Sequence, residues 1–301
     1  QEGYSKEDEQ QAAEKNLVMK KLRDEIIKDV VVTSEEIKAD YDSLVARDED
    51  ASKEDHNAYG KAKLNGQDFY YVPSGYRNVK QILVKFTEEY SEKINTAKSV
   101  LSEKQRATAD AQSALDKNAA DLEKEEDISD ERLQELTDEK AKLQKQLDEA
   151  KQEEAKAQKE VDDALEQGYD DIKDKVNDIY ERAASGEDFD ALADEFNEDS
   201  GMPEEGYAVC DGFADFDKAF IEPAMALKNI GDVSKPSKGI YGYYIVQYAG
   251  DIKEGPVPME EVQEGIKTKF LSQRQNETYE NKVQEWIASG DITIDRDAIK
   301  D

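Results

Sequence analysis

The chain has 301 residues and a mass of 34.0 kDa, and 41 Lys and Arg against 73 Asp and Glu give a formal net charge of −32. This length allows two domains, or one domain with a large insertion. Only 37% of the residues are hydrophobic. No apolar run approaches the roughly 18 residues that a membrane-spanning helix needs, so we expect no transmembrane segment in this chain. The negative charge repels phosphate backbones and argues against nucleic acid as a partner.

The composition also argues against metal and nucleophilic chemistry. A single cysteine, Cys210, cannot form an intrachain disulfide, and a single histidine, His56, cannot build a multi-histidine zinc site. Any Ser-His or Cys-His dyad would have to use His56, which lies in the polar stretch 48–57. The acidic run at 48–50 lacks the ligand spacing of a calcium loop. We therefore predict no metal site and no cofactor.

The N-terminal segment, residues 1–78, is predicted to contribute two helices to a helical lobe. Residues 1–10 are polar, so we expect any targeting signal or anchor to lie outside this chain. Apolar residues recur at helical spacing from Gln11 to Val32. Thr33, followed three residues later by Glu36, has the pattern of a capping box and predicts the start of a second helix.

The central segment, residues 87–167, is predicted to be a long antiparallel coiled-coil hairpin. No Pro or Gly occurs from Thr87 to Leu165. Its first half has a seam position every seven residues, and its second half has apolar residues at steps of three and four: Ile94, Leu101, Thr108, Leu115 and Leu122, then Leu133, Leu136, Leu143, Leu147, Ala150, Ala157, Val161 and Ala164. The phase breaks at 127–131, where Ser129 or Asp130 offers an N-cap, so the tip is predicted near residue 128. Each arm would extend about 55 Å.

The segment after the hairpin changes in character. Residues 173–184 are predicted to be helical up to Gly186, and a short helix is predicted at 189–196. Residues 241–248 (YGYYIVQY) are rich in β-formers and predict a strand. The final segment, residues 251–301, is predicted to hold one helix that begins near Pro258 and packs its aromatic residues against the N-terminal helices.

Several motifs in order resemble the parvulin family of peptidyl-prolyl isomerases. They are residues 79–84 (VKQILV), 186–193 (GEDFDALA), 196–200 (FNEDS), 216–220 (FDKAF), 224–227 (AMAL), 230–236 (IGDVSKP) and 241–246 (YGYYIV). The resemblance implies a parvulin-like domain at 79–86 and 168–250, with the hairpin inserted after its first strand. The flanking helices resemble the composite chaperone lobe of the extracytoplasmic foldases PrsA and SurA. The implied fold class is α+β, with a small antiparallel sheet.

The resemblance also implies site residues in a shallow groove that holds a twisted prolyl bond. The family's apolar proline seat falls on Phe216 and Phe220, with Ala208 at a third position. The family's acidic or thiol position after the second helix falls on Asp199, with Ser200 beside it. We treat Asp199 either as a group that polarises the substrate or as a turn former.

Two positions depart from the family pattern. Active members usually carry a pair of histidines that hydrogen-bond across the floor of the groove, and these positions are Gln81 and Tyr244 in this chain. Both side chains can donate and accept hydrogen bonds, so a Gln–Tyr contact could replace the pair structurally. Proton transfer by imidazole is lost. Because prolyl isomerisation is mainly conformational, the sequence leaves isomerase activity open.

Three hypotheses for function remain. The first is an extracytoplasmic foldase that binds unfolded, proline-containing polypeptide and catalyses X-Pro isomerisation. The second is a holdase that uses the same groove and lobe without catalysis. The third is a surface scaffold whose hairpin serves as a spacer, contacts a partner or drives homo-oligomerisation.

Overall fold

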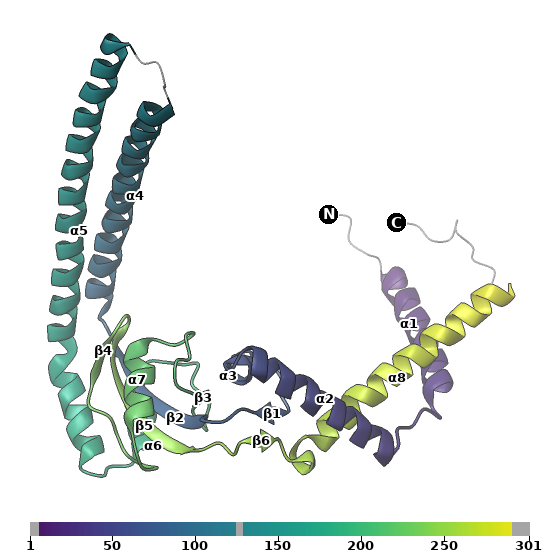
Figure 1. The fold of residues 1–301 in the computed structure, drawn as a ribbon. Helices are drawn as coiled ribbons and strands as arrows, with labels where there is room; N and C mark the ends of the chain where they lie inside the picture. The colour runs from purple at the N-terminus through teal and green to yellow at the C-terminus, as the bar shows by residue number, and fades with distance from the viewer. Residues whose placement is uncertain (1–5, 125–128, 291–301) are drawn as a thin grey trace. The chain divides into compact units, whose positions relative to one another are not determined.

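The computed structural model describes residues 6–124 and 129–290 and divides the chain into two compact units, 75–252 and the pair of segments 1–74 and 253–301. Figure 1 shows the elements of both units in chain colours. Within the described residues, no helix is long and apolar enough to cross a membrane. No cluster of three metal-binding side chains occurs in that same part of the chain.

The sheet of unit 75–252 has four antiparallel strands in the order β3-β2-β5-β4. The strands are β2 (Arg77–Lys85), β3 (Tyr207–Val209), β4 (Ser237–Gly239) and β5 (Gly242–Asp251). β2 and β5 pair along almost their whole length, with Leu83 opposite Tyr244 and Ile82 opposite Ile245. Because side chains alternate along a strand, this register places Leu83 and Tyr244 on one face and Ile82 and Ile245 on the other.

The core of this unit lies on the face that carries Ile82 and Ile245. Apolar residues of two helices, α5 (Asp130–Ala184) and α6 (Phe189–Phe196), pack against it. The buried residues of α5 at this face recur at helical spacing: Tyr169, Ile172, Val176 and Ile179. α6 begins where Asp188 caps the backbone N–H of Asp190. The opposite face is covered by α7 (Lys218–Ala226), which contacts β4 and β5 and places Phe220 against the Tyr244 ring.

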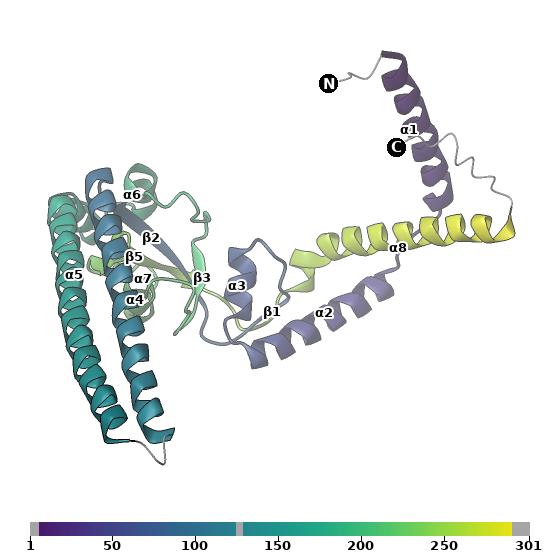
Figure 2. The same cartoon turned by 90° about the horizontal axis from the view of Figure 1, so that it is seen from above.

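The helical hairpin leaves the sheet directly after β2. α4 (Glu88–Lys124) packs along α5, and Ser129 caps α5 by accepting a hydrogen bond from the backbone N–H of Arg132. Figure 2 shows α4 and α5 side by side from above. The predicted cap and the two-helix arrangement are therefore confirmed, whereas the predicted tip near 128 lies outside the described residues. The buried seam of α5 contains fewer residues than predicted, because Leu133, a predicted seam residue, is 43% exposed. α5 also continues without a break past residue 167 to the sheet.

Gly168 marks the root of the hairpin. A Cβ at this position would lie 2.8 Å from Cδ1 of Phe86, which is closer than side-chain atoms normally approach. Phe86 follows β2 and packs against Tyr169 at a tilt, with ring centroids 4.9 Å apart. The glycine thus allows the helix to approach the end of the strand closely.

The second unit is mainly helical. Its elements are α1 (Lys6–Ile27), α2 (Ser34–Glu54), α3 (Ala58–Leu64), a two-stranded sheet of β1 (Tyr71–Val72) and β6 (Gly255–Pro256), and α8 (Met259–Ser289). Thr33 and Glu36 form the predicted capping box at the start of α2. α1 ends at Ile27, five residues before the predicted end, because the chain turns there and Thr33 caps the next helix.

The C-terminal helix packs against the N-terminal helices, as predicted, but its core contact is made by Ile266 rather than by its aromatic residues, of which Tyr279 lies beneath Arg23 of α1. The core of this helical unit contains Ile37 of α2, Ile266 of α8 and Tyr70, which precedes β1. Arg274 of α8 reaches α2 through an ion pair with Glu36, with Nη2 2.6 Å from Oε1. Arg23 of α1 also hydrogen-bonds Asn276 of α8.

Candidate functional site

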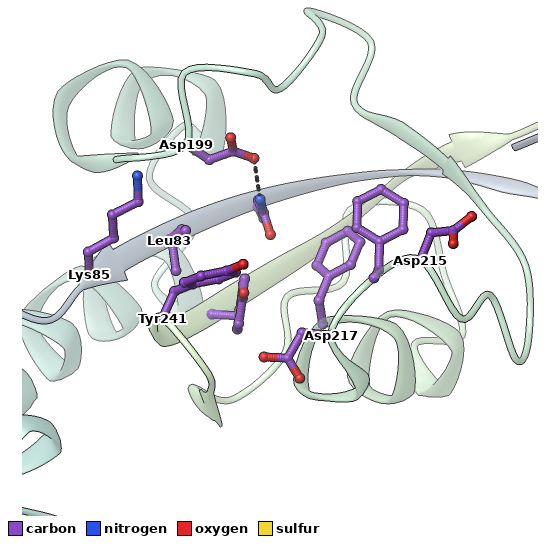
Figure 3. Close-up of a pocket in the computed structure, with 10 residues that line it drawn as sticks. Leu83, Lys85, Asp199, Asp215, Asp217 and Tyr241 are labelled. Atoms are coloured by element: carbon purple, nitrogen blue, oxygen red, sulfur yellow. Dashed lines mark hydrogen bonds between the residues drawn. The ribbon is translucent and has the colours of Figure 1, made fainter. Parts of the chain in front are cut away.

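The largest concentration of predicted site residues lies in a groove on the α7 side of the sheet. Its lining residues come from β2, β5, the turn after α6 and the segment that leads into α7: Gln81, Leu83, Lys85, Asp199, Asp215, Phe216, Asp217, Phe220, Tyr241 and Tyr244. Figure 3 shows Lys85, Leu83 and Tyr241 toward one end, Asp215 at the other and Asp199 above the floor. The groove has a volume of about 260 Å³ and is partly open to solvent.

Aromatic rings form one end of the groove. The Phe216 and Phe220 ring centroids lie 5.0 Å apart, and Tyr207 of β3 packs against Phe216 at 4.9 Å. Phe220 is only 1% exposed, whereas Phe216 is half-buried. These distances are typical of stacked and edge-on aromatic pairs. Phe216 therefore presents an apolar surface to the groove that the rings behind it hold in place.

Asp217 positions the aromatic end. One oxygen, Oδ1, caps α7 by accepting a hydrogen bond from the backbone N–H of Ala219 at 3.0 Å. The other, Oδ2, accepts from the backbone N–H of Ile240 at 2.7 Å, in the turn between β4 and β5. One carboxylate thus fixes both the start of α7 and the turn that carries Tyr241.

The polar floor is organised around Asp199. Its Oδ2 accepts hydrogen bonds from Gln81 Nε2 at 2.6 Å and from the Tyr207 hydroxyl at 2.8 Å, and its Oδ1 accepts from the backbone N–H of Gly201 at 3.0 Å. Figure 3 marks the bond from Gln81 as a dashed line. The turn itself is held to β2 because Asn197 Oδ1 accepts from the backbone N–H of Leu83. These bonds fix the direction of the carboxylate.

Two buried tyrosines, Tyr207 and Tyr244, have raised pKa values. Burial raises the pKa of Tyr207, and the hydrogen bond to the Asp199 carboxylate raises it further. Burial also raises the pKa of Tyr244, with a further contribution from the negative charge of Asp217. Gly239 accommodates the Tyr244 ring, since a Cβ there would lie 2.2 Å from its Cε2 atom. Both hydroxyls stay protonated at neutral pH and can donate hydrogen bonds.

The structure places five of the predicted site residues around this groove: Gln81, Asp199, Phe216, Phe220 and Tyr244. It does not place Ala208 or Ser200 among the lining residues. In β3 the alternation of side chains brings Tyr207, rather than Ala208, to the aromatic rings. Ser200 is exposed beside the turn.

Gln81 and Tyr244, at the two positions of the histidine pair, are not joined by a hydrogen bond in the described chain. Gln81 lies opposite Val246, and Tyr244 lies opposite Leu83, so the two side chains are diagonal neighbours on one face. The Gln81 amide donates to Asp199, and within the described chain no hydrogen bond joins it to Tyr244. A Gln–Tyr contact is therefore not what organises the floor.

Sequence reasoning missed several residues that line the groove or support its lining. Leu83 and Lys85 follow Gln81 at alternate positions of β2, so the strand period alone could have added them. Asp217 precedes α7 and has the residue type of an N-cap. No local signal identifies Tyr207, because its role depends on how β3 pairs with β2.

A groove on a four-stranded antiparallel sheet, with aromatic rings at one end and a hydrogen-bonded polar floor, agrees with the arrangement that the sequence resemblance implied. Residues 81–250 match the Rotamase family, described as a PPIC-type PPIase domain, and the chain belongs to this family. This match covers both sides of the inserted hairpin.

Curated relatives are similar in sequence to part of this chain. It is 33% identical over 124 residues to the foldase protein PrsA of Clostridium botulinum, which covers 40% of this chain and 36% of that protein. It is 33% identical over 138 residues to the foldase protein PrsA 3 of Bacillus cereus, covering 43% and 47%. The chain thus matches about a third to a half of the length of these relatives.

Solved structures give weaker similarity. A SurA-like chaperone from the study of PEB4 and Cj1289 of Campylobacter jejuni shares 16% identity at a TM-score of 0.33, covering 95% of this chain and 73% of that one. PrsA of Bacillus cereus shares 19% identity at a TM-score of 0.23, covering 97% and 90%. Scores this low carry no argument about fold or function.

Proposed function

We propose that this chain is an extracytoplasmic foldase that binds unfolded, proline-containing polypeptide and accelerates X-Pro isomerisation in the groove. The observation that carries the proposal is the half-buried Phe216, backed by Phe220 and Tyr207, beside the fixed floor of Gln81 and Asp199. The foldase names of the partial relatives support it.

The groove has the parts that this reaction needs. Rotation about an X-Pro bond faces a barrier of roughly 18 to 20 kcal/mol because the amide loses conjugation when it twists. An enzyme accelerates the rotation by binding the twisted state more tightly than either planar state. Phe216 and Phe220 would hold the proline ring while the preceding carbonyl turns against the polar floor. The buried Tyr244 hydroxyl, kept protonated, is a donor for that carbonyl oxygen.

Binding without catalysis is the second candidate, and the replaced histidines favour it. The Gln81 amide is oriented by its hydrogen bond to Asp199 and, unlike an imidazole, it cannot transfer a proton to the prolyl nitrogen or carbonyl. If Tyr244 alone does not lower the barrier, the groove still holds proline segments and the chain acts as a holdase.

The helical unit supports a chaperone role in its own right. α1 exposes Leu17, Val18 and Met19 at 52%, 64% and 47%. A group of exposed apolar side chains on one turn of a helix is suited to transient contact with unfolded chains. The proposed location outside the cytoplasmic membrane rests on the foldase relatives.

Exchange NMR tests the proposal directly. Cis–trans exchange in a panel of short Xaa-Pro peptides would be measured with the wild-type chain and with Phe216→Ala. Acceleration that Phe216→Ala abolishes supports the isomerase. Absence of acceleration, with peptide resonances still shifting on binding, would overturn catalysis and leave the holdase.

A further inference from the structure

The side-chain oxygen of Gln81 has no donor. Gln81 lines the groove, is 4% exposed and directs its Nε2 to the Asp199 carboxylate, whereas its Oε1 is buried and has no hydrogen-bond partner among the described groups. The orientation of the amide is determined chemically, because a carboxylate accepts hydrogen bonds and cannot donate one. Oε1 therefore faces away from Asp199, across the floor of the groove.

A buried acceptor of this kind is costly unless a donor reaches it. Proline cannot supply that donor, because its nitrogen carries no hydrogen. A bound proline segment would have to satisfy Oε1 with a group from a flanking residue, either a backbone N–H or a side-chain donor. The affinity of the groove for a proline segment should therefore depend on the residue beside the proline.

The charges around the groove favour a cationic donor. Three carboxylates line it, Asp199, Asp215 and Asp217, against one cation, Lys85. Lys85 lies toward the end opposite Asp215 (Figure 3), so the aromatic end is the more acidic. Asp215 is exposed and has no hydrogen bond or ion pair among the described residues. The net charge of −32 adds long-range attraction for cations.

We propose that the groove selects proline segments that carry Lys or Arg beside the proline, with Gln81 Oε1 accepting a hydrogen bond from the cationic side chain and Asp215 supplying an exposed counter-charge. Asp199 is then a positioning residue, since it fixes the Gln81 amide and holds its acceptor toward the ligand. This inference rests on the proposed function, because it specifies the substrate of the same groove.

The test compares peptides that differ in one group. Three matched peptides would carry Lys, norleucine or Glu immediately before the proline, and a second set would carry them immediately after it. Dissociation constants would be measured by NMR titration of the full chain. We expect Lys to bind about tenfold more tightly than norleucine in one set, which corresponds to one charge-assisted hydrogen bond. Glu should bind more weakly than norleucine.

Variants assign the effect to the groove. Gln81→Met keeps a similar volume but removes both the acceptor oxygen and the N–H group that donates to Asp199, and Asp215→Asn removes an exposed charge without disturbing the core. Each should reduce the Lys-to-norleucine ratio by threefold or more. Asp194→Asn, which removes the same charge from the exposed side of α6, is the matched control and should leave the ratio unchanged. If Gln81→Met does not fold, Asp215→Asn still tests the proposal.

The outcomes are separable from those of the proposed function. Equal affinity for Lys and norleucine in both sets would overturn the inference, because a backbone N–H would then be the donor. A loss of preference in Asp194→Asn as large as in Asp215→Asn would also overturn it, since overall charge would explain the effect. Isomerisation without a Lys preference removes only this inference, and a Lys preference without isomerisation removes only catalysis.

Discussion

Nε2 of Gln81 lies 2.6 Å from Oδ2 of Asp199, so the middle of β2 is tied to the turn that follows α6. The same oxygen accepts from the Tyr207 hydroxyl of β3. One carboxylate therefore links the turn after α6 both to the distant strand β2 and to the nearby strand β3. This relationship explains how the groove keeps a fixed floor although neither position of the usual histidine pair is a histidine.

Replacing Asp199 with Asn should loosen this floor. Asn keeps one acceptor oxygen and places an amide group, which cannot accept, at the other position. Either Gln81 and Tyr207 or the backbone N–H of Gly201 therefore lose their acceptor. We expect the free energy of unfolding of the 75–252 unit to fall by about 1 to 3 kcal/mol, measured by urea denaturation followed by tyrosine fluorescence. The neighbouring Ser200→Ala should change stability by less than about 0.5 kcal/mol. Equal effects of the two variants would contradict the assignment.

Gly239→Ala should disturb Tyr244. The new Cβ would lie 2.2 Å from Cε2 of Tyr244 and 2.5 Å from Oδ2 of Asp217, so the ring or the capping carboxylate must move. Overpacking of this kind costs typically about 1 to 3 kcal/mol. Gly250→Ala is the matched control on the same sheet, because no atom lies within 4 Å of its added Cβ. The account fails here if both substitutions leave the amide spectrum around Tyr244 unchanged.

Acid should weaken the link between α2 and α8. The hydrogen bond from Arg274 and the capping bond at Thr33 lower the pKa of Glu36 to about 2 from an ordinary 4.5. A lowered pKa means that the contribution to stability is complete above 4.5 and is lost as the pH falls toward 2. Carbon-detected NMR of the Glu36 carboxyl gives this pKa directly. Arg274→Ala should raise it toward 4.5, and an unchanged pKa would exclude the ion pair as the main cause.

The hairpin contains a buried polar residue whose replacement should stabilise it. Asn118 is 4% exposed on the α4 seam, and its Oδ1 has no partner among the described groups. Its Nδ2 lies 3.3 Å from the carbonyl oxygen of Leu136, so it also fixes the register of α4 against α5. Asn118→Leu should raise the thermal midpoint, and the exposed Asn95→Leu should not. A lower midpoint in Asn118→Leu would show that the register bond matters more than the buried oxygen.

Local patterns predicted the elements well, and contacts between distant segments account for what they missed. Thr33 and Ser129 were recognisable as caps because capping depends on residues three positions apart. The aromatic seat was visible only through the family resemblance of residues 216–220. That Tyr207 rather than Ala208 faces this seat depends on the register of β3 against β2, which no local pattern encodes. The partner of Gln81 likewise depends on how the turn at Asp199 docks on the sheet.

The central claim is that the groove binds proline segments through its aromatic end. The most direct test is a titration of the isotopically labelled chain with an Xaa-Pro peptide and with the same peptide carrying Ala in place of Pro. The account predicts that the proline peptide shifts the resonances of Gln81, Phe216, Phe220 and Tyr241, that the alanine peptide binds at least about tenfold more weakly, and that Phe216→Ala removes the difference. Shifts confined to residues outside the groove, or equal binding of the two peptides, would contradict it.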